Sequence, residues 1–446
     1  MNLNKASANS MPDSQGKLNQ KLFLLLFAVM SAVGCDAPID GFPRNALFVK
    51  RLEFNEALDL SGANTDANDA LREFFGTPDD PRWPAIAQSA GPGLIEIDRL
   101  QRAAGAVSSD EQGRHVGLYR EHCVVCHGVS GNGRGPTSSL LNPYPRDFRM
   151  GKFKFNSTPI GDKPTRDDLR RLLKHGIVGT SMPAFHLLSE EDLEALVDYL
   201  VYLSVRGEVE RKLLSLAAYE LDVEGGERLF DASVSEDSEK AEQYSQAVER
   251  EIEDVVSTWD LAESAVTPVI GPPAGFPLVG TGVAGATASI ANGKKLFQGN
   301  VAGCAFCHGQ EAIGDGQVNN YDEWTRDWTS MAGLRPGDRS EIQPMLDAGA
   351  LKPRNILPRN LTKGVFRGGS KPEDLYLRIV NGIEGTPMPA APLKPSNPQG
   401  LTNSEVWDIV NFLLSLKPPE KQKETPEVGG HQDTANVSVT KRGSNG

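Results

Sequence analysis

The sequence lacks long hydrophobic runs, an excess of basic residues and all but a few cysteines. Only one apolar run approaches the length of a membrane helix, which excludes a protein that spans the bilayer several times. The net charge of -13 excludes the basic domain or stripe expected of a nucleic-acid-binding protein. A hydrophobic content of 39% excludes a wholly disordered chain. At 446 residues the chain is long enough for about three ordinary domains.

Cysteine is scarce, and four of the five cysteines form two copies of one motif. The motif C-x-x-C-H occurs as CVVCH at 123–127 and as CAFCH at 304–308. It is typical of c-type haem attachment, because its spacing places two thiols one helical turn apart, where they can add to the vinyl groups of one macrocycle. The adjacent histidine can then reach the iron. The sequence therefore predicts two covalently bound haem c groups, held by Cys123, Cys126, Cys304 and Cys307.

Two other interpretations of C-x-x-C are a zinc site and a thioredoxin-like redox pair. A zinc site would combine two such pairs, but here the pairs begin at positions 123 and 304, far apart in the chain. A redox dithiol does not need a histidine after the second cysteine, and this chain has one in both copies. Haem attachment is therefore the favoured interpretation of both motifs.

The N-terminal region resembles a bacterial lipoprotein signal. Residues 22–33 form an apolar run that is too short to span a bilayer but has the length of a signal-peptide core. Gly34 and Cys35 follow the run. Cys35 is the odd cysteine of the chain, and we expect it to be lipidated after removal of the signal peptide 1–34. Ala32 departs from the lipoprotein pattern, which usually has leucine at this position. Ordinary secretory cleavage that leaves Cys35 free is the alternative. Both interpretations export the protein, and we expect it lipid-anchored on the periplasmic side of a bacterial membrane.

Residues 105–206 and 288–417 form an internal repeat. Both contain, in the same order, C-x-x-C-H-G, Pro-Arg followed by Asp or Asn, Gly-x-Phe, and Gly-Ile-x-Gly-Thr-x-Met-Pro. The second copy is longer, and much of its extra length lies in 317–353. Both copies end in an amphipathic helix with a start signal, at Ser189 in the first and as a capping box at Thr402 in the second.

The repeated methionines Met182 and Met388 are candidates for the sixth iron ligand. A neutral thioether favours ferrous iron and so raises the reduction potential. With both axial positions filled, the iron has no open site for peroxide or oxygen. Met can also be simple core filler, but here the same local sequence recurs at the same place in both repeats. His175 and His186 flank Met182 and are the competing ligands in the first copy.

The remaining segments carry little recognisable chemistry. Residues 35–104 are expected to be a weakly ordered or accessory N-terminal segment, and 418–446 a disordered tail. Residues 207–287 contain 17 acidic and 5 basic residues, and form an acidic connector with a helical first part and a Gly/Pro-rich linker. The acidic run is interpreted as a solvated helical face or, alternatively, as a docking surface for a basic partner.

These residues resemble the class I cytochrome c family, present twice. The motifs at 123–127 and 304–308 match the attachment motif of the family, and the two repeated methionines match its axial ligand. Pro136 matches the proline whose carbonyl accepts the proton of the proximal histidine in many members. The second copy lacks this proline, which leaves the acceptor for His308 open.

The resemblance implies a mainly α fold with two small all-α haem domains, cytochrome c domain 1 at 105–206 and cytochrome c domain 2 at 288–417. The acidic, partly helical connector joins them. In this family the first and last helices of a domain pack together through a glycine and aromatic residues. Four residues of the second copy fit that pattern, namely Gly293 and Phe297 against Trp407 and Phe412.

The resemblance also implies the iron ligands. The axial pairs would be His127 with Met182 and His308 with Met388. Haem propionates are often held by arginine, and the candidates at equivalent positions of the repeat are Arg146 and Arg359.

The function that follows is single-electron transfer in an extracytoplasmic respiratory chain, without catalysis. The donor would be a quinol-oxidising complex or a dehydrogenase, and the acceptor an oxidase or another cytochrome, with the lipid anchor as the contact to the membrane. The first alternative is a haem subunit fixed in a larger respiratory or dehydrogenase complex. The second is a dihaem peroxidase, which the two Met-Pro motifs disfavour because a peroxidase needs an open iron.

Overall fold

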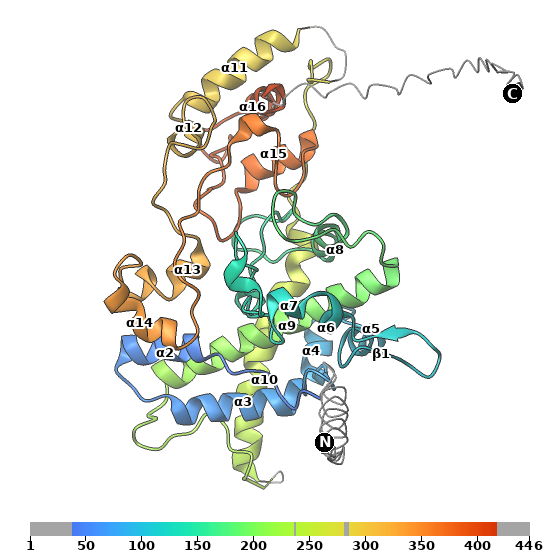
Figure 1. The fold of residues 1–446 in the computed structure, drawn as a ribbon, viewed down its shortest axis with the longest axis vertical. Coiled ribbons are helices and arrows are strands. Elements are labelled where there is room, and N and C mark those ends of the chain that lie inside the picture. The colour runs from blue at the N-terminus through green and yellow to red at the C-terminus, as the bar shows by residue number, and fades with distance from the viewer. Residues whose placement is uncertain (1–37, 236–237, 281–284, 417–446) are drawn as a thin grey trace, which may run out of the picture.

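The computed structural model describes residues 38–235, 238–280 and 285–416, and within these ranges the regular secondary structure is almost all helical, joined by long irregular segments (Figure 1). The described residues form one sheet, in which β1 (Ser108–Ser109) pairs antiparallel with β2 (His115–Val116). The mainly α fold class is therefore confirmed. The expected signal peptide, the lipidation site Cys35 and the expected tail 418–446 lie outside the described residues.

The N-terminal part and the first copy of the repeat share one body, the lower one in Figure 1. Its helices are α2 (Ala46–Glu56), α3 (Ser61–Phe75), α4 (Ala85–Ala90), α5 (Ile97–Ala103), α6 (Leu118–His122), α7 (Val124–His127), η1 (Ser138–Leu140), η2 (Phe148–Met150), α8 (Arg166–His175), α9 (Glu190–Tyr219), α10 (Glu239–Asp260) and η3 (Leu261–Ala265).

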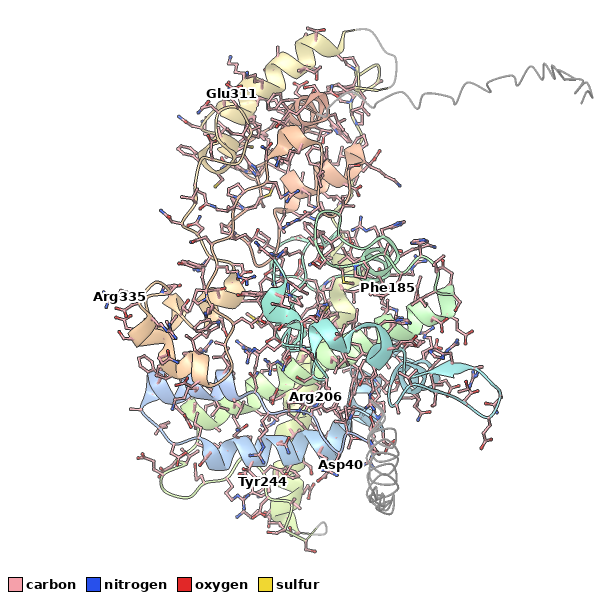
Figure 2. All side chains as sticks on the ribbon, in the orientation of Figure 1. Asp40, Phe185, Arg206, Tyr244, Glu311 and Arg335 are labelled. Atoms are coloured by element: carbon pink, nitrogen blue, oxygen red, sulfur yellow. The ribbon has the colours of Figure 1, made fainter. Side chains whose placement is uncertain are left out.

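The long helix α9 is the centre of this body. It has 30 residues, continues past the expected boundary at 206, and is buried on all sides. Helices α2, α3, α5, α8 and α10 all pack against it. Its buried Asp198 accepts hydrogen bonds from Arg99 Nε (2.8 Å) and the Glu96 backbone N–H (3.0 Å). Arg206, in the middle of the lower body in Figure 2, places its guanidinium 4.2 Å from the Phe42 ring centroid.

The N-terminal segment differs from the expectation of weak order. It forms the four helices α2 to α5, and its apolar residues Leu52, Leu71 and Phe75 are completely buried. The Phe75 carbonyl accepts a hydrogen bond from the hydroxyl of Tyr202 on α9. Each of these helices is too short to be stable alone, so its sequence signal is weak, and packing against α9, or in the case of α4 against α10, stabilises it.

The acidic connector contributes one helix to the same body. Helix α10 packs against α9 and α4 with a face that includes Val248, Ile252 and Trp259, all buried. Lys212 of α9 forms ion pairs with Glu251 (3.1 Å) and Asp254 (3.2 Å). The connector is thus part of the fold, and its role as a docking surface for a basic partner stays a prediction.

The second copy of the repeat forms the upper body in Figure 1, apart from one insertion. Its helices are α11 (Ala286–Gln298), α12 (Cys304–His308), α13 (Glu323–Asp327), η4 (Ser330–Ala332), α14 (Arg339–Asp347), η5 (Leu361–Lys363), α15 (Pro372–Asn381) and α16 (Asn403–Ser415).

Helices α11 and α16 cross closely, as the family resemblance implies. A Cβ atom at Gly293 would lie 1.9 Å from the carbonyl oxygen of Asp408, so only glycine permits this approach. Next to it, the rings of Phe297 and Phe412 lie 5.2 Å apart. Trp407 stacks on Tyr376 of α15, with 5.0 Å between the ring centroids.

The extra length of the second copy, residues 317–353, is called the insert from here on. It leaves the upper body, and its helices α13 and α14 lie beside α2 of the lower body (Figure 1). Its buried Trp328, Ile342 and Met345 cluster with Leu47 of α2. Asp327 forms ion pairs with Arg51 (2.6 Å) and Arg211 (2.9 Å). The insert therefore connects the two bodies.

The capping box expected at Thr402 is present at the start of α16. The Thr402 hydroxyl accepts a hydrogen bond from the Glu405 backbone N–H (3.3 Å), and the Glu405 carboxylate accepts one from the Thr402 backbone N–H (2.7 Å). Thr402→Ala should lower the free energy of unfolding of the second domain by about 1 kcal/mol, because one buried helix end loses its acceptor. Urea unfolding measures this change. Thr402→Ser is the control, and equal stability of both variants would contradict a capping role.

Candidate haem-binding sites

The two C-x-x-C-H motifs each lie on a short helix. In the first motif the His127 N–H donates to the Cys123 carbonyl (2.8 Å), so the two cysteines are one helical turn apart. In the second, α12 runs from Cys304 to His308. The four cysteines at these positions form no disulfide. Both motifs therefore present two thiols and one imidazole in the arrangement that haem attachment requires.

A backbone carbonyl from the repeated Pro-Arg sequence orients each histidine. His127 Nδ1 lies 3.1 Å from the Arg146 carbonyl oxygen, and His308 Nδ1 lies 3.0 Å from the Arg359 carbonyl oxygen. A carbonyl can only accept, so each Nδ1 carries the proton and each Nε2 is free to bind iron. The expectation for Pro136 is wrong: its loop does not supply the acceptor. The acceptor for His308, which the sequence left open, is Arg359.

The reason for this correction is the path of the chain after each motif. The Phe148 N–H donates to the Gly131 carbonyl (2.7 Å), and the Leu361 N–H donates to the Ala312 carbonyl (2.9 Å). These equivalent hydrogen bonds hold the Pro-Arg sequence against the loop that follows the histidine. Gly133, close to Pro136, permits the approach, because a Cβ atom there would lie 2.6 Å from the Pro145 carbonyl oxygen. The Pro-Arg pair, repeated in both copies, was the sequence signal for the true acceptor.

Burial sets the protonation of the site. Burial lowers the pKa of His127 to about 4, against the opposing effect of the hydrogen bond to the Arg146 carbonyl. Burial also lowers the pKa of His308, against the opposing effect of the hydrogen bond to the Arg359 carbonyl. Burial also raises the pKa of the Cys123 thiol to about 12 and that of the Cys304 thiol to about 11. Both imidazoles are therefore neutral at pH 7, as a metal ligand must be.

The two methionine loops have the same geometry. The Met182 N–H donates to the Thr180 hydroxyl (3.1 Å), and the Met388 N–H donates to the Thr386 hydroxyl (3.2 Å). Each methionine carbonyl in turn accepts from the isoleucine five positions earlier, at 3.2 Å and 3.1 Å respectively. Met182 packs against the core, while the competing His175 is exposed. His186 is also exposed, which favours the methionine as ligand in the first copy.

Each copy holds a pair of partly buried cations near its Pro-Arg sequence. The pairs are Arg146 with Lys154 and Arg359 with Arg367, at equivalent positions of the repeat. None of the four has an ion-pair partner among the described residues, and the Nε atoms of Arg359 and Arg367 are buried without a hydrogen bond. Burial lowers the pKa of Arg146 to about 10 and that of Lys154 to about 7. Uncompensated cations of this kind fit the carboxylates of a haem.

Lys154 and Arg367 were missed in the sequence, although Arg146 and Arg359 were not. The signal was available, because both cations follow the repeated Pro-Arg at the same distance along the chain. A lysine aligned with an arginine is less visible than two identical residues. What makes the pair recognisable in the structure is the lack of a carboxylate partner.

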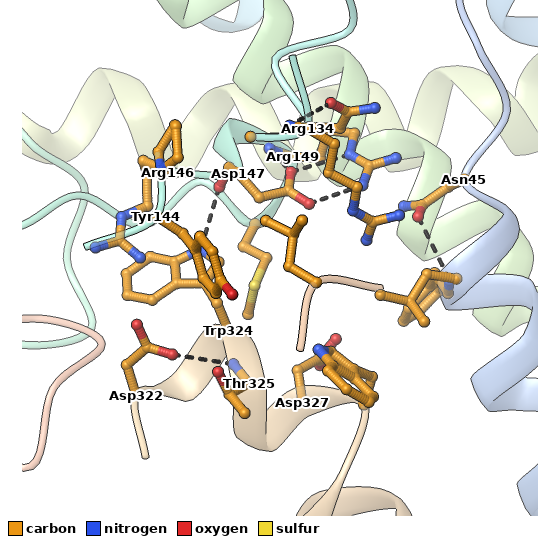
Figure 3. Close-up of a pocket in the computed structure, with 18 of the residues that line it drawn as sticks. Asn45, Arg134, Tyr144, Arg146, Asp147, Arg149, Asp322, Trp324, Thr325 and Asp327 are labelled. Carbon is orange, nitrogen blue, oxygen red and sulfur yellow. Dashed lines mark hydrogen bonds and ion pairs between the residues drawn. The ribbon is translucent and has the colours of Figure 1, made fainter. Parts of the chain in front are cut away.

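A second charged pair, Asp147 with Arg149, lies next to the first site (Figure 3). Arg149 is buried and donates to the Asp147 carboxylate from Nε (2.9 Å) and Nη2 (2.7 Å). Burial acts to raise the pKa of Asp147, but the attraction and hydrogen bonds of Arg149, with a contribution from Arg134, outweigh it and lower this pKa. The pair thus stabilises the fold most when the carboxylate is ionised.

The pH dependence of stability follows from this lowered pKa. The contribution of Asp147 is present above the pKa of the unfolded chain, near 4, and is lost as the pH falls through the lower folded-state pKa. Asp147→Asn should lower the free energy of unfolding by about 2 kcal/mol at pH 7, because Arg149 is left buried without its counter-charge. Urea unfolding at pH 7 and pH 3 should show the difference between variant and wild type shrinking in acid. A constant difference would contradict the assignment.

The described residues contain neither a second kind of metal site nor a membrane-spanning helix. Within the part of the chain that the structure describes, no three His, Cys, Asp or Glu side chains gather to hold a metal ion. Over the same ranges, no helix combines the length and apolar character that crossing a membrane requires. The C-x-x-C-H motifs are therefore the candidate sites on which the rest depends.

Two family models match the chain, one over each copy of the repeat. Residues 111–200 match the family described as cytochrome c oxidase, cbb3-type, subunit III, and residues 290–417 match cytochrome c. Each matched range contains one C-x-x-C-H motif. A comparison with curated proteins finds no match. Among solved structures, a chain of the reducing HAO-like protein complex of Kuenenia stuttgartiensis is similar, with 23% sequence identity, a TM-score of 0.41, and coverage of 70% of this chain and 98% of that chain.

Proposed function

Because the chain carries two cytochrome c domains in tandem, with one covalently bound haem c in each, we propose that it transfers single electrons in an extracytoplasmic respiratory chain. The observation that carries this proposal is the repetition of one site geometry. In both copies a Pro-Arg carbonyl fixes the imidazole, and the same threonine-anchored turn presents a methionine. Two sites built alike favour one shared task.

The residues that would hold the two groups can be named. The covalent links would come from Cys123 and Cys126 in the first domain, and from Cys304 and Cys307 in the second. The axial pairs would be His127 with Met182 and His308 with Met388. When bound, haem supplies an iron that gains and loses one electron.

The protein's own groups set how that iron behaves. The Arg146 and Arg359 carbonyls hold the imidazoles in one tautomer and orientation. The thioethers of Met182 and Met388 favour the ferrous state. The cation pairs Arg146 with Lys154 and Arg359 with Arg367 would compensate the charge of the haem carboxylates when haem is bound.

Two ligands at each iron favour a carrier over an enzyme. A dihaem peroxidase needs one iron with a vacant or displaceable position, and the two equivalent methionine turns speak against it. The alternative of a haem subunit fixed in a larger complex uses the same sites. Co-purification with a membrane complex distinguishes this alternative from a free carrier.

Location and partners complete the proposal. The export signal at 1–34 and lipidation at Cys35 would place the protein on the periplasmic side of a bacterial membrane. The donor would be a quinol-oxidising complex or a dehydrogenase, and the acceptor an oxidase or another cytochrome. Mass spectrometry of the mature protein from membranes tests the anchor, because it shows whether Cys35 carries a lipid. Membrane fractionation gives a second test, in which a Cys35→Ser variant should be released into the soluble fraction.

Stopped-flow oxidation tests the electron-carrier function directly. The fully reduced, haem-loaded protein is mixed either with ferricyanide, which takes electrons without binding iron, or with hydrogen peroxide. We expect fast oxidation of both haems by ferricyanide and slow, non-catalytic reaction with peroxide. Rapid turnover with peroxide would overturn the proposal in favour of a peroxidase.

A further inference from the structure

One aromatic residue of the insert, Trp324, lies between the two haem sites. It belongs to the second domain by sequence, but its helix α13 extends to the first domain (Figure 1). Figure 3 shows the indole between Arg146 and Asp147 on one side and Asp322 and Thr325 of its own helix on the other. Trp324 belongs to none of the three hydrophobic clusters of the described residues, and its contacts reach both domains.

On the side of the first site, Trp324 contacts the residues that orient the proximal histidine. The Arg146 guanidinium carbon lies 3.1 Å from the centroid of the Trp324 ring (Figure 3). The indole Nε1–H donates to the Asp147 carbonyl (3.2 Å). Asp147 directly follows Arg146, whose carbonyl accepts from His127 Nδ1 at 3.1 Å. The carbonyls of two consecutive residues therefore accept the two hydrogen bonds.

On the side of the second site, Trp324 packs against the methionine loop. A Cβ atom at Gly385 would lie 2.1 Å from Trp324 Cζ3 and 2.2 Å from Cη2, so the ring edge rests on the glycine backbone itself. The Glu323 N–H also donates to the Gly385 carbonyl (3.1 Å). Gly385 begins the turn Gly-Thr-Pro-Met that ends at Met388.

We propose that Trp324 couples the two haem sites electronically, by bridging the Asp147 carbonyl of the first domain, which directly follows the carbonyl that accepts from His127, and the Gly385 backbone of the second. The proposal rests on the proposed electron-carrier function and its axial ligands. The route runs from His127 by a hydrogen bond to the Arg146 carbonyl, along the chain to the Asp147 carbonyl, by a second hydrogen bond to the indole, and by a packed contact to the chain that leads to Met388. One electron leaves one site and reaches the other; no bond forms or breaks, no proton moves, and Trp324 is neither oxidised nor reduced.

Electrostatic contacts fix the bridge in place. Lys152 of the first domain forms an ion pair with Glu323, the neighbour of Trp324, and lies 3.7 Å from Glu384, the neighbour of Gly385. The buried Glu384 also accepts from the Gly161 N–H (2.7 Å). One lysine therefore contacts both the segment that carries the indole and the loop on which the indole packs.

A second contact between the sites exists but is more exposed. Arg367 of the second domain donates to the Gly179 carbonyl in the methionine loop of the first (3.2 Å). It involves a long side chain with several rotatable bonds, whereas Trp324 is a rigid ring. The Trp324 route also begins at the carbonyl next to the one that accepts from the proximal histidine His127, so it is the route that we propose.

The test measures exchange of electrons between the haems of the full-length, haem-loaded protein. In a half-reduced sample, two-dimensional exchange NMR of the shifted haem methyl resonances gives the rate, and its independence of protein concentration shows that exchange is intramolecular. Trp324→Leu should slow this exchange severalfold, because the hydrogen bond to the Asp147 carbonyl and the ring contact with Gly385 are both lost. Trp324→Phe, which keeps a ring but loses the hydrogen bond, should be intermediate.

Two controls separate a bridge from a structural role. Trp328→Phe alters a buried aromatic of the same insert that packs on Leu47 and should leave the exchange rate unchanged. The spectrum and reduction potential of each haem in Trp324→Leu should equal those of the wild type. In the wild type the Trp324 indole N–H should exchange slowly with solvent, because it donates to Asp147.

The outcomes are distinct. An unchanged exchange rate in Trp324→Leu, with both haems low-spin and their potentials unchanged, would overturn the bridge and leave the electron-carrier function standing. A fast-exchanging indole N–H would overturn the bridge in the same way. A high-spin haem in the wild type would overturn the proposed function itself, and the bridge with it.

Discussion

Replacing Met388 with alanine is expected to open one of the two irons while the other stays six-coordinate. Half of the haem should become high-spin in the ferric state and bind carbon monoxide in the ferrous state. The reduction potential of that haem should fall, because the thioether no longer favours ferrous iron. Met182→Ala should do the same to the haem of the first domain. Optical spectroscopy and a potentiometric titration measure both effects.

The methionine prediction has a matched control. Met331 lies in the insert and is 56% exposed, so Met331→Ala should leave both spectra and both potentials unchanged. The turn around each ligand offers a further check. The Thr386 hydroxyl accepts a hydrogen bond from the Met388 N–H, so a substitution of Thr386 should change the reduction potential less than a substitution of Met388 itself. Low-spin spectra that persist in both methionine variants would contradict the axial assignment.

Gly293→Ala is expected to destabilise the second domain by about 3 kcal/mol, the upper part of the usual cost of overpacking a core. The reason is steric, since the added methyl group would lie 1.9 Å from the Asp408 carbonyl oxygen and 2.9 Å from Phe412 Cβ. Backbone atoms cannot rotate away, so α11 and α16 must separate. Urea unfolding followed by the haem absorbance of the second domain measures the loss.

The control for Gly293 is a glycine with open space around it. Gly337 has no atom within 4 Å of its would-be Cβ, so Gly337→Ala should change stability by less than about 0.5 kcal/mol. If both variants are equally stable, the close crossing of α11 and α16 is not what holds the second domain together.

Local and repeated features could be predicted from the sequence. The two C-x-x-C-H motifs, the capping box at Thr402 and the packing glycine Gly293 each depend on residues close in the chain or on a known family pattern. The repeat also pointed to Arg146 and Arg359. These features needed no knowledge of how the domains meet.

Features that depend on distant packing could not be predicted. The acceptor for His127 was expected at Pro136, but the carbonyl that reaches it belongs to Arg146, because the intervening loop folds back through its own hydrogen bonds. The N-terminal helices carry weak signals and are stabilised by packing against distant helices, chiefly α9 and α10. The contact of Trp324 with Asp147 joins residues 177 positions apart, and no local pattern marks it.

The optical spectrum of the purified, haem-loaded protein tests whether both irons have His/Met ligation. It is recorded in the ferric and then the ferrous state, with and without carbon monoxide. Two low-spin haems, a ferric methionine–iron charge-transfer band and no response to carbon monoxide are the predicted result for an electron carrier with His/Met ligation at both sites. A high-spin fraction, or one haem that binds carbon monoxide, would contradict it, because an open iron belongs to a peroxidase or a ligand-binding protein.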